Sequence, residues 1–326
     1  MAAGNLPLEA TRKIFETAAL LDRETSKSLL FVSKAVKEWV DPIFYRVVVL
    51  YETQGDFQLL IDSISQRQRT DPTFYSQAVR ALSLPLAHQS LSPTWKSGLE
   101  TILLAFDSLT SLSIPADAWI DLGIQYATPP FNSLTYLRLT KTDLMIGLTI
   151  HYYVPPTVTH LAIPYYLCTN WARLFTDLPC LTHLIWENYD NGELATRSRV
   201  ELARKANYMF TIMPPSLRAL VYVPTGLPPA GEAGARWLDW VAGVTSQVID
   251  PRFVFASIYN RYIDVPGLAC YPETHDIERD WGYRNAGIGP PDVTIWEFAD
   301  NVVDRRFKSG AAALSSWSLT ESYLGV

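Results

Sequence analysis

Cysteine is scarce in this chain of 326 residues, and the three that occur, Cys168, Cys180 and Cys270, show no C-x-x-C spacing. An odd and dispersed set excludes a disulfide framework and a zinc knuckle, so we expect buried thiols that pack as small hydrophobic groups. Long hydrophobic runs are missing as well, since none approaches the roughly 20 apolar residues of a membrane span. We therefore expect a soluble protein without a membrane partner.

An excess of positive charge is also missing. Asp and Glu number 33 against 27 Lys and Arg, the net charge is −6, and the basic residues are scattered along the chain. This distribution argues against a nucleic-acid partner. The first residues, MAAGNLPLEATRK, lack the basic and apolar regions of a signal peptide, which favours a cytoplasmic or nuclear location.

Familiar catalytic and nucleotide-binding motifs are absent from the sequence. It contains no G-x-S-x-G, no P-loop, no G-x-G-x-x-G and no H-E-x-x-H, so it predicts no catalytic residue, no cofactor and no metal. The GIGPP segment at residues 287–291 is interrupted by proline and predicts a turn. Residues 273–285, ETHDIERDWGYRN, concentrate ionisable groups that could form an acid/base site in a cleft, although we favour a solvated loop with salt bridges.

Two helical patterns are present at the start of the chain. Apolar residues recur three or four apart between Ala10 and Leu21, directly after Pro7, which predicts an amphipathic helix. A second pattern runs from Asp22, a suitable N-cap, to Pro42, where we expect that helix to end.

The periodicity changes after these helices. Residues 46–50, RVVVL, are rich in β-branched side chains and predict a strand, and the helical spacing returns between Phe57 and Ile64. We therefore expect residues 1–70 to form a small helical domain.

A short phrase, apolar-x-x-Leu-x-apolar, then recurs six times. It is spelled VRALSL, LTSLSI, LTYLRL, VTHLAI, LTHLIW and LRALVY, starting at residues 79, 109, 134, 158, 181 and 217. Recurrence at intervals of 23 to 36 residues indicates stacked repeats. Helical spacings at residues 95–106 and 171–178 lie between phrases, so each unit is expected to be a strand followed by a helix that shares one core with its neighbours. This pattern predicts an α/β fold with a parallel sheet over residues 71–265.

The C-terminal third follows the same logic less regularly. Residues 224–236 are rich in Pro, Gly and Ala and predict a loop before a helix that contains Trp237 and Val244, and residues 249–258 predict a further strand. Residues 266–326 are dense in Trp and Tyr, and we expect them to cap the open end of the stack. An aromatic pocket there is a second possible recognition site.

The N-terminal pattern resembles an F-box, in a variant common among fungal proteins. The resemblance covers residues 5–50 and is carried by LPLEATRKIF, FVSK and the W-x-x-P-x-x-Y-R spacing from Trp39 to Arg46. The phrases over residues 79–225 are similar to degenerate leucine-rich repeats. None has the asparagine of the family three positions after its last apolar residue, so we expect an irregular solenoid without an asparagine ladder.

The resemblance implies a substrate-recognition adaptor of a Skp-cullin-F-box ubiquitin ligase. An F-box docks on a Skp-type adaptor, and the solenoid face would bind a protein substrate. The side chains implied for the adaptor contact, or for the small core behind it, are Leu6, Pro7, Ile14, Phe15, Leu29, Val32, Trp39 and Pro42. We expect about half of them to face a partner.

Two other functions are compatible with the same pattern. One is an enzyme with a small-molecule pocket built on the repeat scaffold, because a fold does not fix a function. The other is a scaffold that has lost adaptor binding, in which the N-terminal apolar residues would cap one end of the solenoid.

Strand alternation predicts a recognition surface on the repeats. If the Leu and the last apolar residue of each phrase face the core, the residues before and between them face the open side. Parallel strands lie about 4.8 Å apart, which would place Tyr136, His160 and His183 in one row, with Arg138 and Glu187 near it. We expect these five residues to bind substrate, with an ordinary polar sheet face as the alternative. The two histidines have no carboxylate or cysteine at ligand spacing beside them, so we expect no metal there.

Overall fold

The computed structural model describes most of the chain, and by its internal contacts the chain divides into two compact units. The first contains residues 1–143 and 276–292, and the second contains residues 144–275 and 293–326. The boundaries expected at residues 70 and 265 differ from this division and stay predictions. The described residues are 6–50, 54–84, 93–125, 131–140, 154–164, 167–168, 170–188, 199–224, 232–257, 269–270 and 295–309.

Three helices follow one another at the start of the first unit: α1 (Leu8–Leu21), α2 (Arg23–Leu29) and α3 (Lys34–Phe44). The carboxylate of Asp22 accepts a hydrogen bond of 2.7 Å from the backbone N–H of Thr25, which caps α2 as the sequence predicts. The hydroxyl of Ser33 accepts one of 3.2 Å from the N–H of Val36 and caps α3. Each short helix therefore has its own start signal.

The expectation of a single helix from Asp22 to Pro42 is wrong. α2 ends at Leu29, the extended backbone of Ser33 starts a new helix, and α3 continues through Pro42 to Phe44. Pro42 has no N–H to donate to the carbonyl of Glu38, so it costs the last turn of α3 one intrahelical hydrogen bond. The residue before it, Asp41, is buried and forms an ion pair of 2.8 Å with Arg67. This tertiary contact outweighs the preference of that position for an extended conformation.

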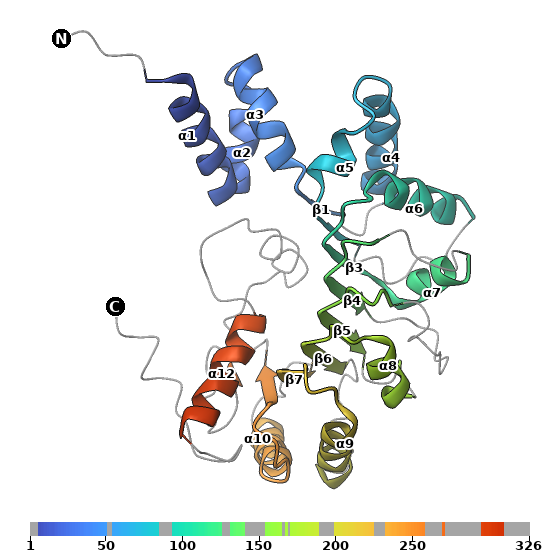
Figure 1. The fold of residues 1–326 in the computed structure, drawn as a ribbon, viewed down its shortest axis with the longest axis vertical. Coiled ribbons are helices and arrows are strands. Elements are labelled where there is room, and N and C mark those ends of the chain that lie inside the picture. The colour runs from blue at the N-terminus through green and yellow to red at the C-terminus, as the bar shows by residue number, and fades with distance from the viewer. Residues whose placement is uncertain are drawn as a thin grey trace, which may run out of the picture. The chain divides into compact units, whose positions relative to one another are not determined.

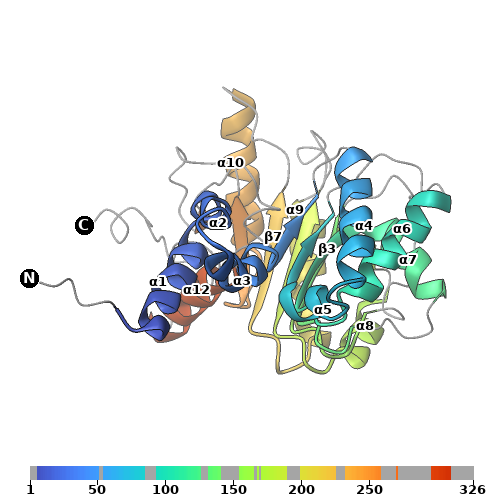
Figure 2. The same cartoon turned by 90° about the horizontal axis from the view of Figure 1, so that it is seen from above.

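The first unit continues with parallel strands in chain order and helices on one side of them (Figure 2). The strands are β1 (Val47–Val49), β2 (Ala81–Ser83), β3 (Ser111–Pro115) and β4 (Tyr136–Thr140). The helices are α4 (Gln54–Gln68), α5 (Phe74–Ala78), α6 (Pro93–Ala105) and α7 (Ala116–Gln125). Leu82, Leu112 and Leu137 occupy paired positions and are buried, so the leucine of each phrase forms a continuous row in the core.

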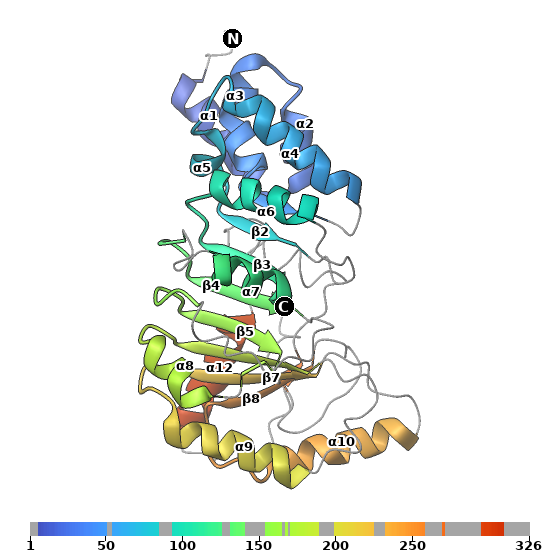
Figure 3. The same ribbon diagram turned by 90° about the vertical axis from the view of Figure 1, so that its right-hand side faces the viewer.

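The second unit repeats this arrangement. Its strands are β5 (His160–Pro164), β6 (His183–Asn188), β7 (Ala219–Pro224), β8 (Phe253–Ser257) and the short β9 (Ala269–Cys270), each parallel to the next. Its helices are α8 (Trp171–Asp177), α9 (Arg199–Ile212), α10 (Glu232–Thr245) and α12 (Ile295–Ser309). α12 lies on the opposite side of the strands from α8 (Figures 1 and 3).

Most of the elements predicted from the sequence are present. Each of the six phrases forms a strand that begins at its third residue. The strands expected at residues 46–50 and 249–258 are β1 and β8, and the helices expected at residues 95–106 and 171–178 are α6 and α8. The protein is therefore an α/β protein with parallel strands. No helix of the described segments is long and apolar enough to cross a membrane.

Hydrogen bonds at the start of the strands join successive phrases. The hydroxyl of Thr110 donates to the carbonyl of Arg80 at 3.1 Å, and that of Thr135 donates to the carbonyl of Thr110 at 3.1 Å. The hydroxyl of Thr182 donates to the carbonyl of Thr159 at 3.0 Å in the second unit. The structure thus contains a threonine ladder, visible in the sequence as the Thr at the second position of four phrases.

The cysteines only partly follow their prediction. Cys168 is buried, but Cys180 is exposed, because it lies in the turn after α8 where the chain reverses direction. The clusters singled out at residues 273–285 and 287–291 lie outside the described residues.

Candidate functional site

The apolar side chains of α1–α3 divide into a surface set and a small core. Among the eight residues predicted for a partner contact, the exposed ones are Leu6, Pro7, Ile14, Val32 and Pro42. Phe15, Leu29 and Trp39 are partly buried and pack against a core made of Ala19, Val36 and Val40. The arrangement therefore provides both a possible contact surface and a support for it.

Sequence reasoning missed further exposed apolar residues in this region. Phe31, in the turn between α2 and α3, is 84% exposed, and Leu8 and Leu21 of α1 are also exposed. The spacing of Leu29 and Val32 suggested one continuous helix and so directed attention away from Phe31. We call the exposed residues Leu6, Leu8, Ile14, Phe31 and Val32 the N-terminal apolar set.

The helices that carry this set are held to the strands and helices of the first unit. Arg23 of α2 donates a hydrogen bond of 3.1 Å to the carbonyl of Val47 in β1 and lies over the ring of Phe44. Arg67 of α4 pairs with Asp41 and lies over the ring of Phe74. Helices that are marginal on their own are therefore stabilised by the strand and helix that follow them.

The second candidate site is the pair of histidines in the second unit. His160 and His183 are paired residues of β5 and β6, and their rings stack with centroids 4.5 Å apart and an interplanar angle of 4°. Their predicted side-by-side position is confirmed. Tyr136, the third member of the expected row, begins β4 in the first unit. Arg138 and Glu187 are buried. A role of these five residues in substrate binding stays a prediction.

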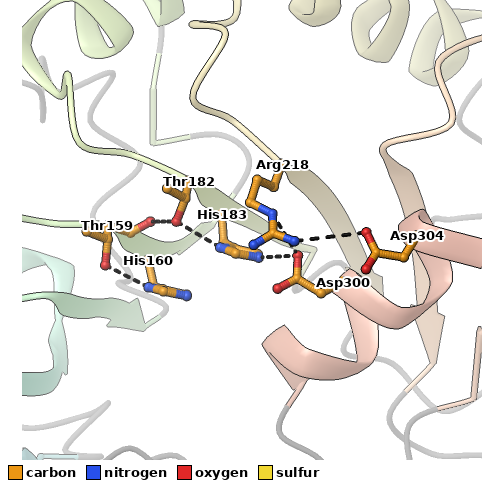
Figure 4. A network of polar contacts seen from close by, with 7 residues as sticks. All are labelled: Thr159, His160, Thr182, His183, Arg218, Asp300 and Asp304. Carbon is orange, nitrogen blue, oxygen red and sulfur yellow. Dashed lines mark hydrogen bonds and ion pairs between the residues drawn. The ribbon is translucent and has the colours of Figure 1, made fainter. Parts of the chain in front are cut away.

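A polar network surrounds the histidine pair (Figure 4). The Nδ1 atoms of His160 and His183 lie 2.7 and 2.9 Å from the hydroxyls of Thr159 and Thr182. The Nε2 atom of His183 lies 3.1 Å from Oδ1 of Asp300 in α12. Because this carboxylate can only accept, Nε2 donates, so in the neutral ring Nε2 carries the proton. The network thus fixes the tautomer of His183.

The environment keeps both rings neutral at neutral pH. Burial, together with the neighbouring His183, lowers the pKa of His160 to about 3. Burial also lowers the pKa of His183, while Asp300 raises it and Arg218 lowers it again. Arg218 lies 3.4 Å from Oδ1 of Asp300 and 3.9 Å from Oδ1 of Asp304. The pair is therefore suited to packing and hydrogen bonding rather than to proton transfer near pH 7.

α12 covers the histidine row. The Trp296 ring meets His160 edge-on at a centroid distance of 4.9 Å and His183 at 5.8 Å. Trp296 and His183 are each only 4% exposed. The side of the strands that we expected to be open to a ligand is thus occupied by a helix of the same chain. The sequence signal that could have revealed it is the helical spacing of Trp296, Ala299 and Val303.

No protein-family model matches the chain, and no curated protein matches it either. The functional interpretation therefore depends on the geometry of these two sites and on the motif pattern of the sequence.

Metal binding and the reactivity of Cys168 can be assessed within the described residues. No group of three or more His, Cys, Asp and Glu side chains within these segments could hold a metal ion. Burial raises the pKa of the Cys168 thiol to about 12, so its thiolate is not formed near neutral pH.

Proposed function

We propose that the protein is a substrate-recognition adaptor of a Skp-cullin-F-box type ubiquitin ligase, in which α1–α3 bind a Skp-type adaptor. The observation that carries this proposal is the exposure of the N-terminal apolar set on helices that already have their own core. Large exposed apolar side chains that form one patch are typical of protein interaction sites.

The exposed side chains of the set can contribute favourable free energy to a contact. Burying a Leu, Ile or Phe side chain that was exposed contributes about 1.5–3 kcal/mol. Phe31 is 84% exposed and Ile14 is 55% exposed, so most of that contribution is still available to a partner. Several such side chains together can offset the loss of translational and rotational freedom on association.

The parallel strands support the second half of the proposal. Strand phrases that recur along the chain, pair in parallel within each unit and are linked by a threonine ladder fit a degenerate leucine-rich-repeat solenoid. Such a solenoid would present a protein substrate. Of the residues proposed to recognise it, Tyr136 and His160 are partly exposed, whereas Arg138, His183 and Glu187 are buried and would have to be uncovered first.

Co-purification with a Skp-type adaptor tests the proposal. We expect the full-length protein to retain the adaptor and the Ile14→Asp variant to lose at least about tenfold in affinity, because a charge would be buried in an apolar contact. The matched control is Leu104→Asp on α6, since Leu104 is 57% exposed against 55% for Ile14. This control should bind like the unmodified protein. Failure of the unmodified protein to bind the adaptor would remove the ligase function.

A further inference from the structure

α12 presents one face to the strands and the other to solvent. Its buried residues follow the spacing i, i+3, i+7 and i+10, which is one stripe of a helix: Trp296, Ala299, Val303 and Arg306. The residues exposed on the other side are Glu297, Asn301, Asp304, Phe307 and Lys308. α12 is thus an amphipathic helix that docks through a narrow stripe.

The side of the strands that receives this stripe carries several small apolar residues. Ala219 pairs with His183, and Val221 of β7 pairs with Val254 of β8. Because side chains alternate along a strand, these three small residues share the side of His183 and all are buried. Small side chains let a helix approach the strands closely.

Polar contacts fix the helix at both ends of the stripe. In the first half of α12, Trp296 packs on the histidine rings. Four residues later, Asp300 contacts His183 and Arg218. Near its end, Arg306 donates hydrogen bonds to the backbone carbonyls of Pro251, at 3.2 Å, and Phe253. This side of the strands therefore contacts an aromatic residue, an acid four positions later and a base ten positions later.

The position of α12 differs from that of the other helices of the second unit. α8 contacts the opposite side of the strands, where Trp171 meets Trp186 of β6. This is the side on which the strand-then-helix unit of the repeat places its helix. α12 comes after the last of these strands and adds a separate layer. An amphipathic helix that contacts a surface through spaced anchors is also the way in which separate helical peptides are bound.

The geometry points to a helix-binding surface on the His183 side of β5–β8, which α12 occupies as a built-in ligand. The partner that fits this surface is an amphipathic helix of another protein with the pattern aromatic-x3-acid-x5-base and small apolar residues between. Such a helix binds by displacing α12. This inference does not depend on the adaptor function.

A fluorescent peptide with the sequence of residues 293–310 tests the inference by anisotropy. The titrated proteins are the full-length chain and its Trp296→Ala/Arg306→Gln variant, in which α12 has lost two anchors. We expect the variant to bind the peptide at least about tenfold more tightly, because in the unmodified chain only the fraction with an open surface is competent to bind. Equal affinities, with strands intact in both proteins, would overturn the inference.

Two control peptides and one fold control make the result specific. A peptide carrying the same two changes should not bind the variant, whereas a peptide changed on the outer side, Glu297→Gln/Phe307→Ala, should bind like the parent. Hydrogen exchange of β6 and β7 amides reports whether the strands remain folded. If they do not, the milder Asp300→Asn variant replaces the double variant and is judged by the same comparison.

Discussion

The N-terminal helices and α12 are both amphipathic, but they differ in what their apolar residues meet. Ile14 of α1 is 55% exposed, while Trp296 of α12 is 4% exposed. The first surface has no cover among the described residues, and the strand side in the second unit is covered by the chain itself. An interaction surface can therefore be exposed to a partner, or it can be covered by a helix of the same chain until a partner competes with that helix. Different experiments are needed to reveal an exposed surface and a covered one.

Truncating one aromatic residue in each region should show the largest contrast. We expect Trp296→Ala to lower the free energy of opening α12 by about 3–5 kcal/mol, because it removes a buried indole. Phe31→Ala should change stability by less than about 0.5 kcal/mol, because that ring is in water. Native-state hydrogen exchange of the α12 amides measures the first, and chemical denaturation measures the second. A large loss of stability in Phe31→Ala would show that this ring is part of a core and not of a contact surface.

Acid should destabilise the second unit through His160. The pKa of His160 in the folded protein is lowered to about 3, whereas in the unfolded chain it is about 6.5. The unfolded state then binds the extra proton, so the stability of the second unit should fall as the pH drops from about 6.5 toward 3. One proton corresponds to at most about 1.4 kcal/mol per pH unit.

Denaturant unfolding at a series of pH values checks this prediction, with His160→Phe as the control. Phenylalanine keeps a flat ring against His183 and Trp296 but cannot be protonated, so its stability should depend less steeply on pH over this window. The same slope in both proteins would assign the acid sensitivity to other groups.

Sequence reasoning was most accurate where a local pattern decides the structure. The six strands were found because Leu82, Leu112 and their equivalents recur at a fixed place in each phrase, and a buried strand needs apolar residues at that place. The break at Ser33 was missed although it is also local, because the apolar spacing continues across it and the capping signal is a single hydroxyl.

The cover over the histidine row could not be predicted in the same way. Alternation specifies the side of a strand on which His183 lies, but not what lies against that side. Asp300, which bonds to His183, is 117 residues away in the sequence, and no local pattern at His183 refers to it. Contacts of this kind depend on how separate segments pack, which a spacing rule does not contain.

The smallest expected effects concern the threonine ladder, and they sharpen the contrast between the two units. Thr135→Val in the first unit removes one hydroxyl bond to a carbonyl that still accepts two backbone N–H groups, from Thr135 and Tyr136. We expect a loss of about 0.5–1 kcal/mol in the free energy of unfolding. Thr182→Val should cost more, about 1–1.5 kcal/mol, because it also takes away the partner of His183 Nδ1.

Chemical denaturation of both valine variants and of the matching Thr→Ser variants measures these losses. Serine retains the hydroxyl, so each Ser variant should be more stable than its Val counterpart. Equal losses at the two positions would mean that the Thr182 hydroxyl serves the ladder alone. The tautomer of His183 would then be set by Asp300 without help from Thr182, and the histidine pair would be tied to the rest of the second unit mainly through α12.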